Sequence, residues 1–210
     1  MAAHAWKSNA HMLADLFRVM RPPSGPWVDL TFGEYGAWWN PPNVAPDGLV
    51  RCVGPDTVSE RGDVLRTDFR STPFRDGVFG LTCFDPPYVL KGGAGKFDGM
   101  NRRYGIGAEL TGKRGGVSRK EALFGLVEDG LTEAARITRK SGWVLAKAGR
   151  GVDGGKLVRT DDLMVRTGED LGLNVLTTLL LLSRPRSQAH RGPQRTPRAN
   201  FSTLIVFEVP

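Results

Sequence analysis

The sequence predicts an α/β fold, with one domain built around a doubly wound, mostly parallel sheet. The chain has 210 residues, which suits one domain with a sizeable core better than two complete domains. Short apolar segments alternate with amphipathic ones along most of the chain, as in proteins whose parallel strands are joined by helices. The last two apolar segments have no helix between them, so we expect an antiparallel hairpin at one end of the sheet.

Each element follows from periodicity and from the residues at its ends. The first helix, 7–20, has apolar side chains at three- and four-residue steps and stops before Pro22. The second, 118–139, has Ser118 as N-cap with Glu121 three residues later, and a third spans 161–171. Strands are expected at 27–31, 49–53, 64–67, 79–84, 143–148, 174–182 and 202–209.

Composition excludes several classes of protein. Apolar residues make up 40% of the chain and charged residues 24%, which is ordinary for a globular domain. Two cysteines, Cys52 and Cys83, are too few for a disulfide scaffold and lack the spacing of a zinc site. The longest apolar stretch, 176–182, is far shorter than the ~20 residues that span a bilayer, and no targeting segment is apparent. We therefore expect a soluble cytoplasmic protein without membrane or metal partners.

Basic residues are concentrated in two segments. The chain has 29 Lys and Arg against 22 Asp and Glu. Segment 89–120 has eight basic and two acidic residues, and segment 184–198 has five arginines and no acid, which leaves the rest mildly acidic. Clustered Lys and Arg gain affinity for phosphate backbones by releasing condensed counterions, so the pattern indicates a nucleic-acid partner. A surface of solvated loops is the alternative reading.

The two basic segments are also the least regular parts of the chain. Residues 89–116 are rich in glycine, and we expect a long mobile loop there. Residues 184–201 contain three prolines among the arginines, so we expect an arginine-rich arm within the final hairpin. The candidate phosphate contacts are Lys91, Lys96, Arg102, Arg103, Arg184, Arg186, Arg191, Arg195 and Arg198.

The strongest local motif is Asp85-Pro86-Pro87-Tyr88, directly after the apolar strand 79–84. The carboxyl ends of strands are where open α/β sheets bind ligands, so the motif places a carboxylate, a rigid backbone and an aromatic ring at that rim. None of the three histidines lies beside a candidate nucleophile, which argues against histidine-based catalysis. An Asp-Pro turn is the structural alternative.

In this position the motif resembles that of the S-adenosylmethionine-dependent methyltransferases that modify adenine N6 or cytosine N4. The resemblance implies a Rossmann-like class I methyltransferase domain over residues 1–210, with S-adenosylmethionine as cofactor. Asp85 and the Pro86 carbonyl would accept the two hydrogens of the target amine. Pro87 would keep the backbone beside that carbonyl rigid, and Tyr88 would stack on a base removed from its helix.

The segment Asp29 to Gly36 is similar to the cofactor-binding motif I of the same family. Within it, the resemblance assigns cofactor contacts to Asp29, Thr31, Phe32, Gly33 and Gly36. Glycines at such a turn let the backbone approach the cofactor closely. The usual pattern separates two glycines by one residue, whereas two residues separate them here, so we expect a differently shaped loop.

Less specific pieces complete the resemblance. Asp56 matches the acid that binds the ribose hydroxyls, and Asp68 with Phe69 matches the motif that recognises the adenine ring. Ordinary turns are the alternatives for both. Helix 9–17 resembles the motif X helix, although a helix of the core explains its Met and Leu residues as well. The adjacent Trp38 and Trp39 are better explained as a wall than as a stacking platform.

Together these features predict a methyltransferase acting on an exocyclic amine of a nucleic-acid base. Adenine N6 in DNA is the preferred target, because the resembling family uses Asp at the first motif position more for adenine than for cytosine. An RNA or cytosine-N4 methyltransferase is the alternative within the class. A non-catalytic nucleic-acid-binding protein with this fold is the alternative outside it, and the altered glycine spacing is its support.

Overall fold

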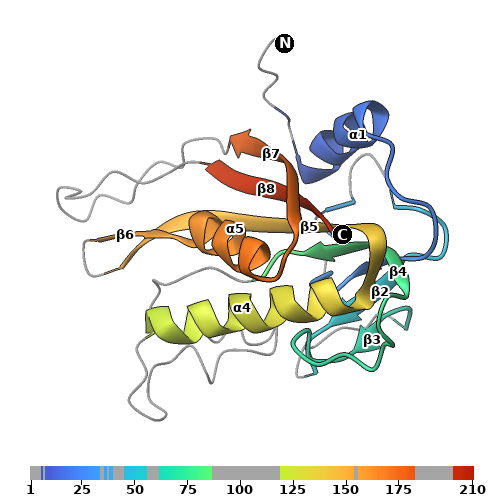
Figure 1. Cartoon of the computed structure of the whole chain (residues 1–210), viewed down its shortest axis with the longest axis horizontal. Coiled ribbons are helices and arrows are strands. Elements are labelled where there is room, and N and C mark those ends of the chain that lie inside the picture. The colour runs from blue at the N-terminus through green and yellow to red at the C-terminus, as the bar shows by residue number, and fades with distance from the viewer. Residues whose placement is uncertain are drawn as a thin grey trace.

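The computed structural model places much of the chain in one sheet flanked by helices (Figure 1). The described residues are 6, 8–33, 36, 38–39, 45–55, 62–86, 119–153, 156–182 and 201–210. The predicted loop 89–116, residues 184–200 of the predicted arm, and all nine candidate phosphate contacts therefore lie outside the described residues. So do Asp56, Pro87, Tyr88 and Ser118.

The sheet confirms the doubly wound class. Its strands are β1 (Trp27–Asp29), β2 (Val50–Val53), β3 (Leu65–Arg66), β4 (Phe79–Phe84), β5 (Thr138–Asp153), β6 (Lys156–Arg159), β7 (Asn174–Leu182) and β8 (Phe201–Glu208). Their order is β3-β2-β1-β4-β5-β8-β7, and β6 pairs with β5 outside this path. The pairs from β3 to β5 are parallel, whereas β8 is antiparallel to both β5 and β7. The predicted C-terminal hairpin is present.

This topology brings several chain segments to one edge of the sheet, which we call the carboxyl edge. The carboxyl ends of β1, β2, β4 and β5 share it because these strands are parallel. Strand β7 runs in the same direction, since β8 is antiparallel to both of its neighbours. Leu182 at the end of β7 and Phe201 at the start of β8 are paired, so they lie at this edge too.

The described helices cover opposite faces of the sheet. Helix α1 (Asn9–Val19) packs on one face with its buried apolar side chains, and the Ser8 side chain caps it by accepting a hydrogen bond from the His11 N–H. Helices α4 (Arg119–Ile137) and α5 (Thr160–Asp170) pack on the other face (Figure 1). In the central strand β4, Leu81 and Cys83 face α1 while Phe84 faces α4, as strand alternation requires.

The hairpin of β5 and β6 is the main feature that the sequence did not predict. Strand β5 extends from Thr138 to Asp153, beyond the expected 143–148, and β6 returns antiparallel to it. Glycines and charges dominate this stretch, and only Val158 in β6 is buried, so no alternation signals a strand. Among the described residues no helix is long and apolar enough to cross a membrane.

Candidate active site

Two aspartates follow or end neighbouring strands at the carboxyl edge. Asp29 ends β1 and pairs in register with Cys83 of β4, and Asp85 comes two residues after Cys83. The chain keeps bonding past β1, because the Leu30 N–H donates to the Cys83 carbonyl at 3.0 Å and the Phe32 N–H donates to the Cys52 carbonyl at 3.1 Å. The predicted motif I and catalytic motif therefore meet at the centre of the sheet.

Asp29 is fully buried, and described neighbours occupy both of its oxygens. Oδ1 accepts the Thr31 backbone N–H at 3.0 Å, and Oδ2 accepts Trp39 Nε1–H at 2.9 Å. Burial raises the pKa of Asp29 from 3.8 to about 7 and the nearby Asp85 adds to the rise, whereas the two hydrogen bonds oppose it. Because Asp29 is buried and accepts hydrogen bonds from Thr31 and Trp39, it stabilises the turn after β1. Its predicted direct contact with the cofactor stays a prediction.

Asp85 lies in a different environment, because it is partly exposed and bound to a lysine. Its Oδ2 accepts Lys147 Nζ at 2.9 Å and Trp38 Nε1–H at 3.2 Å. Its backbone N–H donates to Thr31 Oγ1 at 2.7 Å, which ties the motif to the end of β1. No described residue donates to Oδ1. One carboxylate oxygen is thus anchored to the protein, and the other is without a donor among the residues described.

The two tryptophans each hold one of these aspartates. Trp38 and Trp39 are almost wholly buried and pack with the apolar face of α1. Because their indole N–H groups donate to Asp85 and Asp29, they link helix α1 to both strand ends. Their burial agrees with the expectation that the two tryptophans form a wall of the core and not a stacking platform. It also agrees with the alternative that helix 9–17 is a helix of the core.

The altered glycine spacing has a structural reason. Gly33 and Gly36 have φ values of +65° and +57°, in the left-handed region that favours glycine. A Cβ at Gly36 would lie 2.6 Å from Cζ of the buried Phe32 ring, so a side chain there would collide. The Trp39 N–H then donates to the Gly36 carbonyl at 3.0 Å. The turn therefore folds over Phe32 and delivers Trp39 to Asp29.

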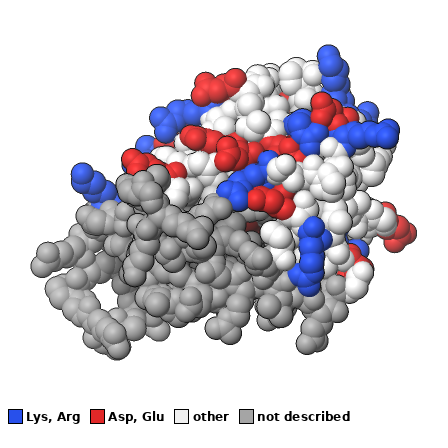
Figure 2. Space-filling model, turned by 90° about the horizontal axis from the view of Figure 1, so that it is seen from below, with Lys and Arg blue, Asp and Glu red and all other residues white. Residues whose placement is uncertain are grey.

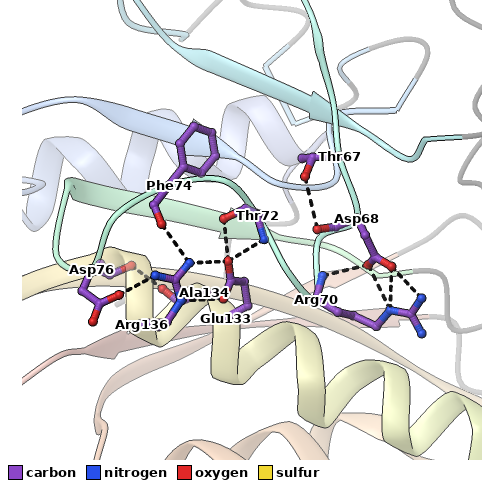
Figure 3. Close-up of polar contacts among 10 residues, drawn as sticks. Thr67, Asp68, Arg70, Thr72, Phe74, Asp76, Glu133, Ala134 and Arg136 are labelled. Carbon is purple, nitrogen blue, oxygen red and sulfur yellow. Dashed lines mark hydrogen bonds and ion pairs between the residues drawn. The ribbon is translucent and has the colours of Figure 1, made fainter.

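The third predicted acid, Asp68, follows β3 and is bound by an arginine. The Arg70 guanidinium donates to both of its oxygens at 2.6–3.1 Å, and the Arg70 backbone N–H donates to Oδ1 at 2.9 Å (Figure 3). This charged hydrogen bonding lowers the pKa of Asp68. Phe69 is buried, and its ring lies 5.6 Å from that of Phe84. The predicted adenine contacts of Asp68 and Phe69 stay predictions.

A buried glutamate fixes the segment after Asp68 against α4. Glu133 Oε1 accepts the Thr72 N–H at 2.7 Å and the Thr72 hydroxyl at 2.5 Å, and its carboxylate also binds Arg136 (Figure 3). Although burial opposes ionisation, the bonds from Arg136 and Thr72 lower the pKa of Glu133. Arg136 also binds the exposed Asp76 and donates to the Phe74 carbonyl. This network holds the loop between β3 and β4.

Cysteine or metal chemistry has no support among the described residues. Cys52 and Cys83 are free and buried, and burial raises the pKa of both thiols, to about 12 for Cys52. No group of three or more potential metal ligands occurs in the described parts of the chain.

Where the surface is described in the view of Figure 2, acidic and basic side chains are interspersed.

Lys147 is a residue of the candidate site that the sequence did not predict. It belongs to β5, next to the position where Ala146 pairs with Phe84, so it lies beside Asp85. Only 8% of its side chain is exposed. The available signal was a lysine inside the apolar run from Trp143 to Ala148, where a strand buried on both faces should exclude charge.

Comparisons with known proteins give the fold. No family model matches the sequence, and no curated protein matches it. TrmN from Thermus thermophilus aligns with 96% of this chain and 49% of its own at 14% identity, with a TM-score of 0.53. A geranyl diphosphate methyltransferase solved with GPP and sinefungin aligns with 96% of this chain and 76% of its own at 12% identity, with a TM-score of 0.52. A Leishmania major SAM-dependent methyltransferase aligns with 99% and 79% at 10% identity, with a TM-score of 0.51.

These matches show that the chain has the Rossmann-like fold of class I methyltransferases. The chain spans about half the length of TrmN. It also spans 52% of a second Thermus thermophilus protein, one proposed to be a DNA modification methylase, at 13% identity and a TM-score of 0.45. Identities this low define the fold and leave the reaction to be argued from the site.

Proposed function

We propose that this chain is an S-adenosylmethionine-dependent methyltransferase that modifies an exocyclic amine of a nucleic-acid base, with adenine N6 in DNA as the first target. The observation that carries the proposal is the position of Asp85. It follows β4 at the carboxyl edge of a methyltransferase fold, with one oxygen anchored and no described donor on the other. Open α/β sheets bind their ligands at this edge.

The proposed chemistry follows from what a base amine needs. Its lone pair is delocalised into the ring, so the nitrogen becomes nucleophilic only when it pyramidalises. Asp85 Oδ1 and the Pro86 carbonyl would supply two acceptors for its two hydrogens, and the ring of Pro87, next in the sequence, restricts the backbone beside that carbonyl. Tyr88, next in the sequence, would stack on the base, and such stacking contributes ~1–3 kcal/mol.

The described turn after β1 fits the cofactor in part. Gly33 and Gly36 both adopt the left-handed φ of a tight glycine turn, the kind of turn at which the resembling family holds the amino-acid part of S-adenosylmethionine. Thr31 fixes this turn to Asp85 through its hydroxyl. When bound, the cofactor supplies a methyl group activated by a sulfonium. The fold and the turn support this assignment, and Asp56 and Asp68 remain proposed contacts.

Topology supports nucleic acid as the partner. The first basic segment follows Pro86 at the end of β4, and the second connects Leu182 of β7 with Phe201 of β8. All three of these flanking residues belong to the carboxyl edge, so both segments connect to the sheet at the edge where Asp85 lies. We propose that the arginines and lysines within them contact phosphates, which predicts an affinity that falls steeply with salt.

The experiment is a methyl-transfer assay with product identification. The purified chain is incubated with labelled S-adenosylmethionine and, separately, unmethylated DNA and RNA, and the products are digested to nucleosides. We expect N6-methyladenine from DNA, with at least a ~100-fold loss in Asp85→Ala, the size seen when one preorganised polar group is removed from an active site. Asp170→Ala, an exposed aspartate on α5, is the matched control and should keep full activity.

The other outcomes are equally informative. Methylcytosine or a methylated RNA nucleoside would keep the proposed mechanism and change the target. If neither nucleic acid is methylated and calorimetry detects no cofactor binding, the proposal that this chain is a methyltransferase is refuted. A protein that then still bound DNA would be the non-catalytic alternative.

A further inference from the structure

Lys147 is a lysine buried in the centre of the sheet. Strand β5 lies between β4 and β8, and Lys147 pairs in register with Leu204 of β8. Only 8% of its side chain is exposed. An ammonium taken out of water is costly unless it is paired, so the position of Lys147 depends on its carboxylate partner.

Among the described residues, the Lys147 ammonium contacts Asp85 and Trp38. Its Nζ lies 2.9 Å from Asp85 Oδ2 and 5.9 Å from the centre of the Trp38 ring. The Trp38 indole N–H reaches the same oxygen at 3.2 Å. Two donors on one oxygen fix the rotation of the carboxylate, and the face of the Trp38 ring favours the lysine cation. Asp85 Oδ1 is consequently held in one orientation.

We propose that Lys147 is the positioning residue for Asp85, and the proposal rests on the methyl-transfer function above. It holds the carboxylate in one orientation, so that Oδ1 accepts a hydrogen of the target amine. Without the ammonium, the Trp38 N–H is the one described donor left on the Asp85 carboxylate, which then rotates more freely. Misplacement of a reacting group by about 1 Å costs roughly 100-fold in rate, and this is the loss expected when Lys147 is removed.

The variants separate positioning from packing. Lys147→Met keeps the length and apolar stem of the side chain and removes the charge, whereas Lys147→Arg keeps a donor. We expect kcat to fall ~100-fold in Lys147→Met, with the KM for S-adenosylmethionine nearly unchanged, and to recover in part in Lys147→Arg. Lys140→Met, at an exposed position on the same strand, is the control and should match the wild type.

A double variant guards against misfolding, because Lys147→Met leaves Asp85 without its cation. In the double variant, Asp85→Asn with Lys147→Met, neither charge of this pair is left without the other, and thermal unfolding reports whether the fold is kept. If Lys147 acts through Asp85, adding Lys147→Met to Asp85→Asn lowers kcat no further. A second loss as large as that in the single variant would overturn the proposal.

The outcomes distinguish this proposal from the one on which it rests. A wild-type chain that methylates DNA or RNA, with Lys147→Met equally fast, keeps the function and overturns the role of Lys147. A KM effect without a kcat effect also overturns it, since that result assigns Lys147 to binding. A wild-type chain that transfers no methyl group to either nucleic acid overturns both.

Discussion

Gly36 offers a quantitative test of the turn that follows β1. An alanine there adopts a φ of +57°, which costs about 1–2 kcal/mol for a residue with a Cβ. The new Cβ would also lie 2.6 Å from Cζ and 2.8 Å from Cε2 of the Phe32 ring, about 1 Å inside contact. Overpacking of this kind costs about 1–3 kcal/mol. We therefore expect Gly36→Ala to lower the free energy of unfolding by about 2–5 kcal/mol.

Urea unfolding of matched variants measures this difference. Gly48 has a φ of +76° and nothing within 4 Å of a built Cβ, so Gly48→Ala should cost only the backbone part, about 1–2 kcal/mol. In a Phe32→Ala background the ring is absent, and Gly36→Ala should then cost no more than Gly48→Ala. Equal losses in the two single variants would refute the argument that Gly36 is required by the Phe32 ring.

Two further predictions concern buried carboxylates. The raised pKa of Asp29 means that the folded protein binds a proton more tightly than the unfolded chain does. The stability that this proton binding adds is present below pH 4 and is lost as the pH rises through about 7, by on the order of 4 kcal/mol. Urea titrations from pH 5 to 8 should show the decline in the wild type and not in Asp29→Asn, and parallel pH profiles of the two proteins would contradict it. Glu133→Gln weakens the bonds to Thr72 and Arg136 and should lower the free energy of unfolding by about 1–3 kcal/mol in the same assay. Asp76→Asn, which changes the exposed partner of Arg136, should lower it by under ~1 kcal/mol. Equal losses in the two variants would contradict the conclusion that the buried Glu133 holds the loop between β3 and β4.

Much of the fold was predictable because its signals are local. The strand Phe79–Phe84 and the helix Asn9–Val19 agree with expectation within two residues, since each carries its own apolar pattern and ending signal. The final hairpin was predictable from the missing helix before Phe201. Strand β6 was not, because its pairing with β5 comes from tertiary context and its one buried residue, Val158, makes no pattern.

The candidate site was predictable only in its motif residues. Asp29 and Asp85 stand out because each follows an apolar run, but what surrounds a carboxylate depends on residues distant in the chain. Lys147 is 62 positions from Asp85 and Trp38 is 47 positions from it. The spacing of Gly33 and Gly36 predicted a differently shaped loop but not its cause, since the Phe32 ring that requires glycine at position 36 is visible only in three dimensions.

The neighbouring carboxylates of Asp29 and Asp85 lie in opposite environments, which argues for separate roles. Thr31 bonds to both, donating its N–H to Asp29 and accepting the N–H of Asp85 at its hydroxyl, so the two are fixed relative to each other. Asp29 is sealed from water, lacks a cation among the described residues, and has a pKa near neutrality. Asp85 has Lys147 beside it and 19% of its side chain exposed. Because Asp85 is accessible and paired with a cation, it is the carboxylate suited to contact a substrate. The buried Asp29 instead stabilises the turn after β1.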